Sequence, residues 1–271
     1  MTAPANGRCA VGRSVAALIA GWAAAASLTL PVLAQQRTGG PAASQTARAS
    51  APFDLTGYWV SVVTEDWRYR MVTPTKGDYQ SLPLRVEAAR IADGWDPTAD
   101  TAAGLQCKSY GAPAVMRIPG RVHISWRDEI VLVIETDAGT QTRVLNFRAG
   151  GAIGPRSWQG SSTAVWEFPV RGAAPVPQAG GAAGPRPGTL KVRTTNLRAG
   201  YLRKNGVPYS QDAVLTEYFD YTRLRGGDEM LVLTAIVEDP TYLTQPYIVS
   251  SQFKRQTDAT GWDPTPCSST W

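Results

Sequence analysis

Few side chains in this sequence have the chemistry of a catalytic group. His123 is the only histidine among the 271 residues, and histidine is the side chain that most often serves as a general base. His123 stands in the middle of an expected strand, on the face shared with Arg121 and Ser125, where a histidine that simply packs on the sheet is the alternative. No G-x-S-x-G motif accompanies it, so the sequence does not indicate a Ser-His-acid triad.

Glu217 is a second candidate, because it alternates with apolar residues and is therefore expected on the inward face of a strand. A buried carboxylate needs a partner, and Arg143 and Tyr218 are the types of group that could supply it. The alternative is an outward residue on a twisted edge strand. The candidate catalytic set is therefore His123, Glu217, Arg143 and Tyr218.

Metal and nucleotide chemistry are not indicated by the sequence. One histidine cannot build a zinc site without several carboxylates, and Asp96, Asp100 and Asp212 lack the spacing of a calcium loop. No phosphate-binding glycine loop or dinucleotide fingerprint occurs. We therefore expect no cofactor and no metal site.

Aromatic residues are the most suggestive feature of the expected strands. A closed barrel of about eight strands has room for one small ligand, and aromatic walls with a few polar groups are typical of a pocket for an apolar molecule. The alternative is that these rings only fill the core. The candidate ligand-binding residues are Trp126, Trp166, Tyr201 and Tyr218.

The elements that must position these side chains are mostly strands. Short segments rich in Val, Ile, Thr, Tyr and Trp are separated by Gly, Asp, Asn or Pro, which predicts an antiparallel barrel or a sandwich. One short helix is expected near 82–94, with Ser81 as its cap. The expected strands are 56–63, 66–72, 113–118, 121–126, 129–136, 140–147, 162–168, 189–196, 212–222, 229–238 and 246–255.

The first 34 residues have the pattern of a signal peptide, with an early positive charge, an apolar run and an Ala-ending cleavage site. A retained membrane anchor is the alternative. Residues 35–51 are expected to form a disordered tail, and 52–271 a single β domain with a mobile Pro/Gly-rich loop at 172–188. The location expected from this pattern is periplasmic or secreted, with no stable membrane span after cleavage.

Two cysteines, Cys107 and Cys267, remain after removal of the signal. In an oxidising compartment an even pair predicts a disulfide. Each follows a Gly-Trp-Asp-Pro-Thr segment, at 94–98 and at 261–265, and the two copies either dock near each other or are coincidental. The formal net charge of the whole chain is +5, without a basic run interleaved with aromatics, so nucleic acid is not an expected partner.

Two resemblances can be stated. Gly57-Tyr58-Trp59 resembles the G-x-W start of lipocalins, which implies that Trp59 closes a barrel floor and packs on Lys254 or Arg255. The second resemblance, over roughly 80–255, is to a widespread family of exported bacterial proteins without an established activity. Its members often carry a histidine where Tyr209 stands here. The motifs that carry it include Cys107…Gly111-Ala112-Pro113, Trp158-x-Gly160-x-Ser162, Leu215-Thr216-Glu217 and Val237-Glu238-Asp239-Pro240.

The leading hypothesis is an exported binding protein for a small apolar or aromatic molecule in a β-barrel cavity. The alternative is an enzyme that acts on a small hydrophobic substrate in the same cavity without metal or nucleotide. A structural envelope protein remains a third class, and the sequence does not give the oligomeric state. A cavity lined by both His123 and Glu217 would favour the enzyme.

Overall fold

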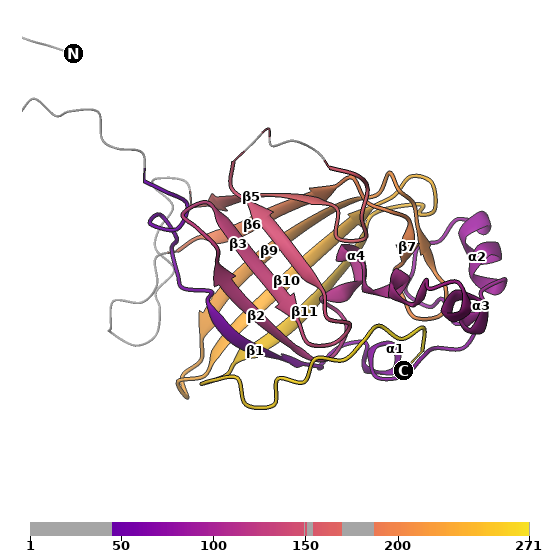
Figure 1. Cartoon of the computed structure of the whole chain (residues 1–271), viewed down its shortest axis with the longest axis horizontal. Helices are drawn as coiled ribbons and strands as arrows, with labels where there is room; N and C mark the ends of the chain where they lie inside the picture. Colours follow the sequence, from indigo (N-terminus) through magenta and orange to yellow (C-terminus); the bar gives the residue numbers. More distant parts are fainter. Residues whose placement is uncertain (1–44, 149, 151–153, 170–186, 271) are drawn as a thin grey trace, which may run out of the picture. The chain divides into compact units, whose positions relative to one another are not determined.

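A computed structural model describes residues 45–148, 150, 154–169 and 187–270 (Figure 1). The expected signal peptide at 1–34 lies outside the described residues. So does most of the expected mobile loop at 172–188, of which only 187 and 188 are described.

Nine strands form a closed barrel, which confirms the expected mostly-β class and decides between barrel and sandwich. The order around the barrel is β1-β11-β10-β9-β6-β5-β4-β3-β2. Only β4 and β5 pair in parallel, and the other neighbours are antiparallel. The strands are β1 (Gly57–Val62), β2 (Arg121–Trp126), β3 (Val131–Thr136), β4 (Thr142–Asn146), β5 (Ser161–Glu167), β6 (Thr189–Thr195), β9 (Val214–Arg223), β10 (Glu229–Glu238) and β11 (Tyr247–Arg255).

Side chains fill the interior of this barrel. Every strand contributes inward residues to a single buried cluster, which includes Trp59, Ile134, Leu190, Phe219 and Phe253. The alternation of buried and less buried positions along β5 and β9 follows from the period of two of a strand. The place where the sequence suggested a ligand is therefore occupied by the protein's own core.

Short helices gather at one end of the barrel, called here the capped end (Figure 1). The connection between β1 and β2 supplies all of them, and the small sheet of β7 (Gly200–Tyr201) and β8 (Pro208–Tyr209) lies beside them. The helices are α1 (Trp67–Arg70), α2 (Val86–Asp93), α3 (Pro97–Ala102), η1 (Gln106–Tyr110) and α4 (Ala112–Val115). None of the helices in the described ranges is long and apolar enough to cross a membrane.

Two of the expected strands are helical instead. Residues 66–72 contain α1, and the adjacent residues Tyr69 and Arg70 are both buried there. In a strand, two adjacent residues would face opposite sides of the sheet. Residues 113–118 contain α4, and burial is continuous from Ala112 to Ile118. A short helix that plugs a barrel end accounts for this continuous burial.

The helix expected near 82–94 is present as α2, but its start differs. Ser81 has a φ of 68° and does not cap it; Arg85 stands at the N-cap, and the helix begins at Val86. The sequence also missed α3. Asp96 caps this helix by accepting a hydrogen bond of 2.8 Å from the Thr98 amide, and Pro at the first position starts a helix as readily as it ends one.

Residues 45–51, expected to be part of a disordered tail, are folded onto the end of the barrel opposite the cap. The Trp166 indole donates a hydrogen bond of 2.8 Å to the Ala47 carbonyl, and the Arg48 amide donates to the Glu129 carbonyl at 3.1 Å. Ala51 packs against the barrel core. The composition of this segment did not reveal these contacts because they depend on barrel residues far away in sequence.

The expected contact between Trp59 and a basic residue of the last strand is confirmed. Arg255 lies over the Trp59 ring, 4.4 Å from its centroid, and the two residues are paired in the β1–β11 register. The Trp59 indole donates to the Leu55 carbonyl at 2.9 Å. Lys254 points elsewhere and pairs with Asp228.

The expected disulfide between Cys107 and Cys267 is also confirmed, with a Cα–Cα distance of 5.1 Å. It ties η1 to the segment that follows β11. The two Gly-Trp-Asp-Pro-Thr copies have different neighbours, because Trp95 packs on Gly206 whereas Trp262 contacts the Tyr58 ring. The repeat therefore marks two separate turns.

Candidate functional site

Three of the four candidate catalytic residues lie on or beside the barrel strands β4 and β9, but only two of them meet. Arg143 and Glu217 form a bidentate ion pair inside the barrel, with one N–O distance of 2.8 Å. Both side chains are at most 1% exposed. The inward position of Glu217 and Arg143 as its partner are thus confirmed. Tyr218 faces outward, where Lys191 lies 5.4 Å from its ring centroid.

His123 lies on the outer face of the barrel, away from Glu217. Its Nδ1 is 3.0 Å from Glu135, and its ring stacks on Tyr58 with centroids 4.4 Å apart. Trp262 contacts both rings edge-on. The wall of the barrel therefore separates the imidazole from the Arg143–Glu217 pair, and the four residues do not form one site. Within the described ranges, no group of three or more His, Cys, Asp or Glu residues could hold a metal ion.

Aromatic rings form a connected row across the end of the barrel opposite the cap, called here the aromatic end. Trp126 contacts Phe147, Phe147 contacts Trp166, and Trp166 meets Phe53 edge-on, with centroids 5.5–5.6 Å apart. Phe53 then stacks on Tyr221 at 5.5 Å. The row includes Trp126 and Trp166 from the candidate ligand-binding set, but neither Tyr201 nor Tyr218.

A recess of about 400 Å³ opens beside the last two rings of this row. Pro52, Phe53 and Tyr221 give it apolar walls, and Asp54, Glu229 and Arg255 give it polar ones. Arg255 is held by Glu229 and by the carbonyls of Asp54 and Thr56. Burial raises the pKa of Tyr221, and the negative charge of Glu229 raises it further, so the phenol is neutral at physiological pH.

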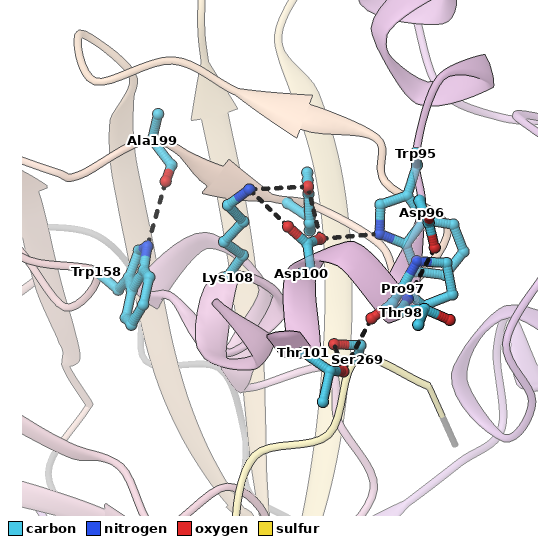
Figure 2. A network of polar contacts seen from close by, with 11 residues as sticks. Trp95, Asp96, Pro97, Thr98, Asp100, Thr101, Lys108, Trp158, Ala199 and Ser269 are labelled. Atoms are coloured by element: carbon cyan, nitrogen blue, oxygen red, sulfur yellow. Dashed lines mark hydrogen bonds and ion pairs between the residues drawn. The ribbon is translucent and has the colours of Figure 1, made fainter. Parts of the chain in front are cut away.

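Tyr201 belongs to a different hydrogen-bond network, at the capped end. Figure 2 labels its partners Asp100 and Lys108. The Tyr201 hydroxyl donates to Asp100 at 2.8 Å, and Lys108 reaches both Asp100 at 2.8 Å and the Tyr201 oxygen at 3.1 Å. The Trp95 indole donates to the same carboxylate at 3.1 Å. Burial, followed by Asp100, raises the pKa of Tyr201 strongly. Because Asp100 already accepts three donors, the network holds α3, η1 and β7 together.

Removing the Tyr201 hydroxyl tests this structural role. We expect Tyr201→Phe to lower the free energy of unfolding by about 1–2 kcal/mol, because a partly buried hydrogen bond to a charged group is lost. Tyr79→Phe is the matched control, since Tyr79 donates to Asp93 at 2.7 Å in an exposed position, and we expect a smaller loss there. Urea denaturation of both variants gives the comparison, and equal losses would contradict the assignment.

Sequence reasoning missed the residues that line the recess. Tyr221 continues the inward alternation of Glu217 and Phe219 on β9. Extending that alternation by two residues would have placed Tyr221 on the inward face. Phe53 and Asp54 precede the first strand, and no periodic pattern places them. Arg255 was identified only as a partner for Trp59.

The class of this protein is therefore a closed nine-stranded β barrel with a helical cap at one end. No protein-family model matches the chain, and neither a curated protein nor a solved structure matches it.

Proposed function

We propose that this chain is an exported binding protein for a small apolar or aromatic molecule, and that the ligand occupies the recess at the aromatic end. The observation that supports the proposal is the recess of about 400 Å³, which adjoins a row of rings continuous with the barrel core. Pockets for small molecules are concave, mostly apolar, and carry a few fixed polar groups.

The polar groups at the recess are held in place before any ligand arrives. Arg255 is fixed by Glu229 and by its position over the Trp59 ring, and Asp54 accepts from the Thr56 amide at 2.9 Å. Preorganised polar groups reduce the entropy lost on binding. An aromatic molecule stacked beside Phe53 and Tyr221 could therefore also be oriented by a polar substituent.

The recess is not the site that the lipocalin resemblance implies. It lies at the end where Trp59 and Arg255 meet, which corresponds to the floor of the barrel in that resemblance, whereas the interior is packed with side chains. The class of ligand is therefore the one expected from the sequence, but the proposed binding place is the barrel end and not the barrel interior.

The enzyme hypothesis gains no support from a specific contact. His123 pairs with Glu135 outside the barrel, and Glu217 is neutralised by Arg143 within it. A general base needs to reach a substrate within hydrogen-bonding distance, and no described recess brings these two groups together. Export remains part of the proposal on the signal-like first 34 residues, and the Cys107–Cys267 disulfide is in keeping with an oxidising compartment.

Binding at the recess can be tested with the neutral fluorescent probe N-phenyl-1-naphthylamine. We expect the probe to bind, and Tyr221→Ala to raise its Kd by about tenfold, because the variant loses the apolar area that the probe would bury against the Tyr221 ring, at about 25 cal/mol per Å². Tyr218→Ala is the matched control, since Tyr218 is on the same strand but faces outward. A Kd that changes equally in both variants, or no binding at all, would contradict the proposal.

A further inference from the structure

Three charged side chains line the recess at the aromatic end. Two are carboxylates, Asp54 and Glu229, and one is a guanidinium group, that of Arg255. The partners that the chain already gives to these three groups determine which ligand chemistry the recess favours.

The positive charge of Arg255 is already compensated by the protein. Its Nε lies within ion-pair distance of the Glu229 carboxylate, although it is not aligned for a hydrogen bond. Its Nη1 donates to the Thr56 carbonyl, and its Nη2 donates to the Asp54 carbonyl. Each of the three nitrogens therefore faces an oxygen of the chain, and the guanidinium group is held as part of the barrel end.

The carboxylate of Asp54, in contrast, keeps one oxygen available. Its Oδ1 accepts from the Thr56 amide at 2.9 Å and from the Thr56 hydroxyl at 2.7 Å. Its Oδ2 accepts no hydrogen bond from the residues that the structure describes, and the side chain is exposed. A ligand donor can therefore bind Oδ2 without displacing a contact of the protein.

The lining of the recess has one negative charge left over. Glu229 and Arg255 neutralise each other as an ion pair, and Asp54 remains. The positive charge of Arg223 also acts on Tyr221, but Arg223 is exposed and does not line the recess. A molecule in the recess is thus in contact with the charge of Asp54, whereas the charge of Arg223 reaches it only through screening solvent.

The aromatic walls act in the same direction as Asp54. Phe53 and Tyr221 line the recess, and their rings stack with centroids 5.5 Å apart. The face of an aromatic ring is the negative end of its quadrupole, so it attracts a cation and repels an anion.

We propose, on the basis of the binding function proposed above, that the ligand of this recess is an aromatic molecule with a protonated amine. Asp54 Oδ2 accepts a charge-assisted hydrogen bond from the amine, while Phe53 and Tyr221 contact the aromatic part. An aromatic carboxylate is disfavoured at the same place, because Arg255 is already paired and Asp54 repels a second negative charge.

The experiment compares three competitors that share one ring system and differ in charge: 1-naphthylmethylamine, 1-naphthylmethanol and 1-naphthoate. Each is used at neutral pH to displace N-phenyl-1-naphthylamine from the disulfide-bonded protein. We expect the amine to bind about fivefold more tightly than the alcohol, which is the upper range for one solvent-exposed charge pair, and the carboxylate to bind more weakly than the alcohol.

Asp54→Asn is the decisive variant, because asparagine keeps an oxygen that can accept from the Thr56 amide and loses the charge. We expect the ratio of the alcohol Kd to the amine Kd to fall from about five to about one. Asp128→Asn is the matched control. Asp128 accepts from the Ile130 amide at 2.8 Å in the turn between β2 and β3, but it does not line the recess, so the ratio should equal that of the wild type.

The salt dependence of the wild type tests the same point without any variant. Raising the ionic strength from about 0.01 M to about 1 M shortens the reach of a charge from about 30 Å to about 3 Å. We expect the preference for the amine over the alcohol to decrease, whereas a salt effect on the apolar contacts is shared by both compounds and leaves their ratio unchanged.

The amine preference and the proposed binding function fail in different ways. Equal binding of the three competitors, or an amine preference that persists in Asp54→Asn, would overturn the amine and leave a site for an uncharged aromatic molecule. Tightest binding of the carboxylate would also overturn it and would assign recognition to Arg255 or Arg223. If neither the naphthylamine probe nor any competitor binds, the proposed function itself is contradicted.

Discussion

Replacing Glu217 with leucine is expected to lower the free energy of unfolding by about 3–5 kcal/mol, because Arg143 would be left as an unpaired charge inside the barrel. The ion pair is bidentate, and its side chains are at most 1% exposed. Because bulk water does not reach Arg143, it cannot replace the missing carboxylate. Replacing both partners, Arg143→Met with Glu217→Leu, is expected to recover most of the loss, since apolar side chains of similar volume satisfy the barrel core. Urea denaturation of the wild type, both single variants and the double variant gives the coupling energy.

The matched control for this cycle is the pair of Lys191 and Glu167 on the neighbouring strands β6 and β5. Its N–O distance is 3.0 Å, but its side chains are 35% and 43% exposed. Exposed ion pairs contribute little to stability because water screens them, so Glu167→Leu should change stability little. A small loss at Glu217, comparable with that at Glu167, would show that the Arg143 charge finds another partner and would contradict the buried pair.

Removing the disulfide by Cys107→Ser together with Cys267→Ser is expected to cost about 3–5 kcal/mol of unfolding free energy. The bond joins residues 160 positions apart, and a long closed loop restricts the unfolded chain strongly. The C-terminal segment it anchors is otherwise held by a few contacts, such as the 2.9 Å hydrogen bond from Thr140 Oγ1 to the Thr265 carbonyl and the 3.0 Å contact of Thr101 with Ser269.

Denaturation and hydrogen exchange together test this expectation. In the double-serine variant, the backbone amides of Thr265 and of residues 267–270 should exchange faster than those of the barrel strands, because the segment loses its covalent tie. The wild type in a reducing agent should behave like the variant. Unchanged stability and unchanged exchange would mean that the noncovalent contacts of this segment are sufficient to hold it.

The barrel strands were predictable from the sequence because they are rich in β-prone residues and because strands such as β5, β6 and β9 alternate inward and outward residues. The same alternation predicted that Glu217 faces inward, and the need of a buried carboxylate for a partner led to Arg143 and Tyr218 as candidates, of which Arg143 is the partner. The strand prediction failed at 66–72 and 113–118, where β-prone residues form α1 and α4. Packing at the barrel end decides those segments, since Tyr69, Arg70 and the run from Ala112 to Val115 are buried on all sides, and local propensity contains no information on such packing.

The candidate site was largely beyond prediction. Phe53, Tyr221 and Arg255 lie far apart in the sequence, so only the closed fold brings them to one recess. The aromatic row was partly anticipated through Trp126 and Trp166, whereas Tyr201 and Tyr218 were grouped with them by type alone. Tyr201 lies in the Asp100 network, and Tyr218 lies on the outer face of the barrel. The type of a side chain does not tell these places apart unless the face of the strand on which it lies is also known.

Native mass spectrometry of the protein purified from its native host tests the proposed binding function most directly. We expect a small apolar or aromatic molecule to copurify with the wild type and with Tyr218→Ala, and to be lost or strongly reduced in Tyr221→Ala. The same molecule should quench tryptophan fluorescence when added back, because Trp166 adjoins the recess through Phe53. Wild-type protein that carries no such molecule and does not bind the naphthylamine probe would contradict the proposed function.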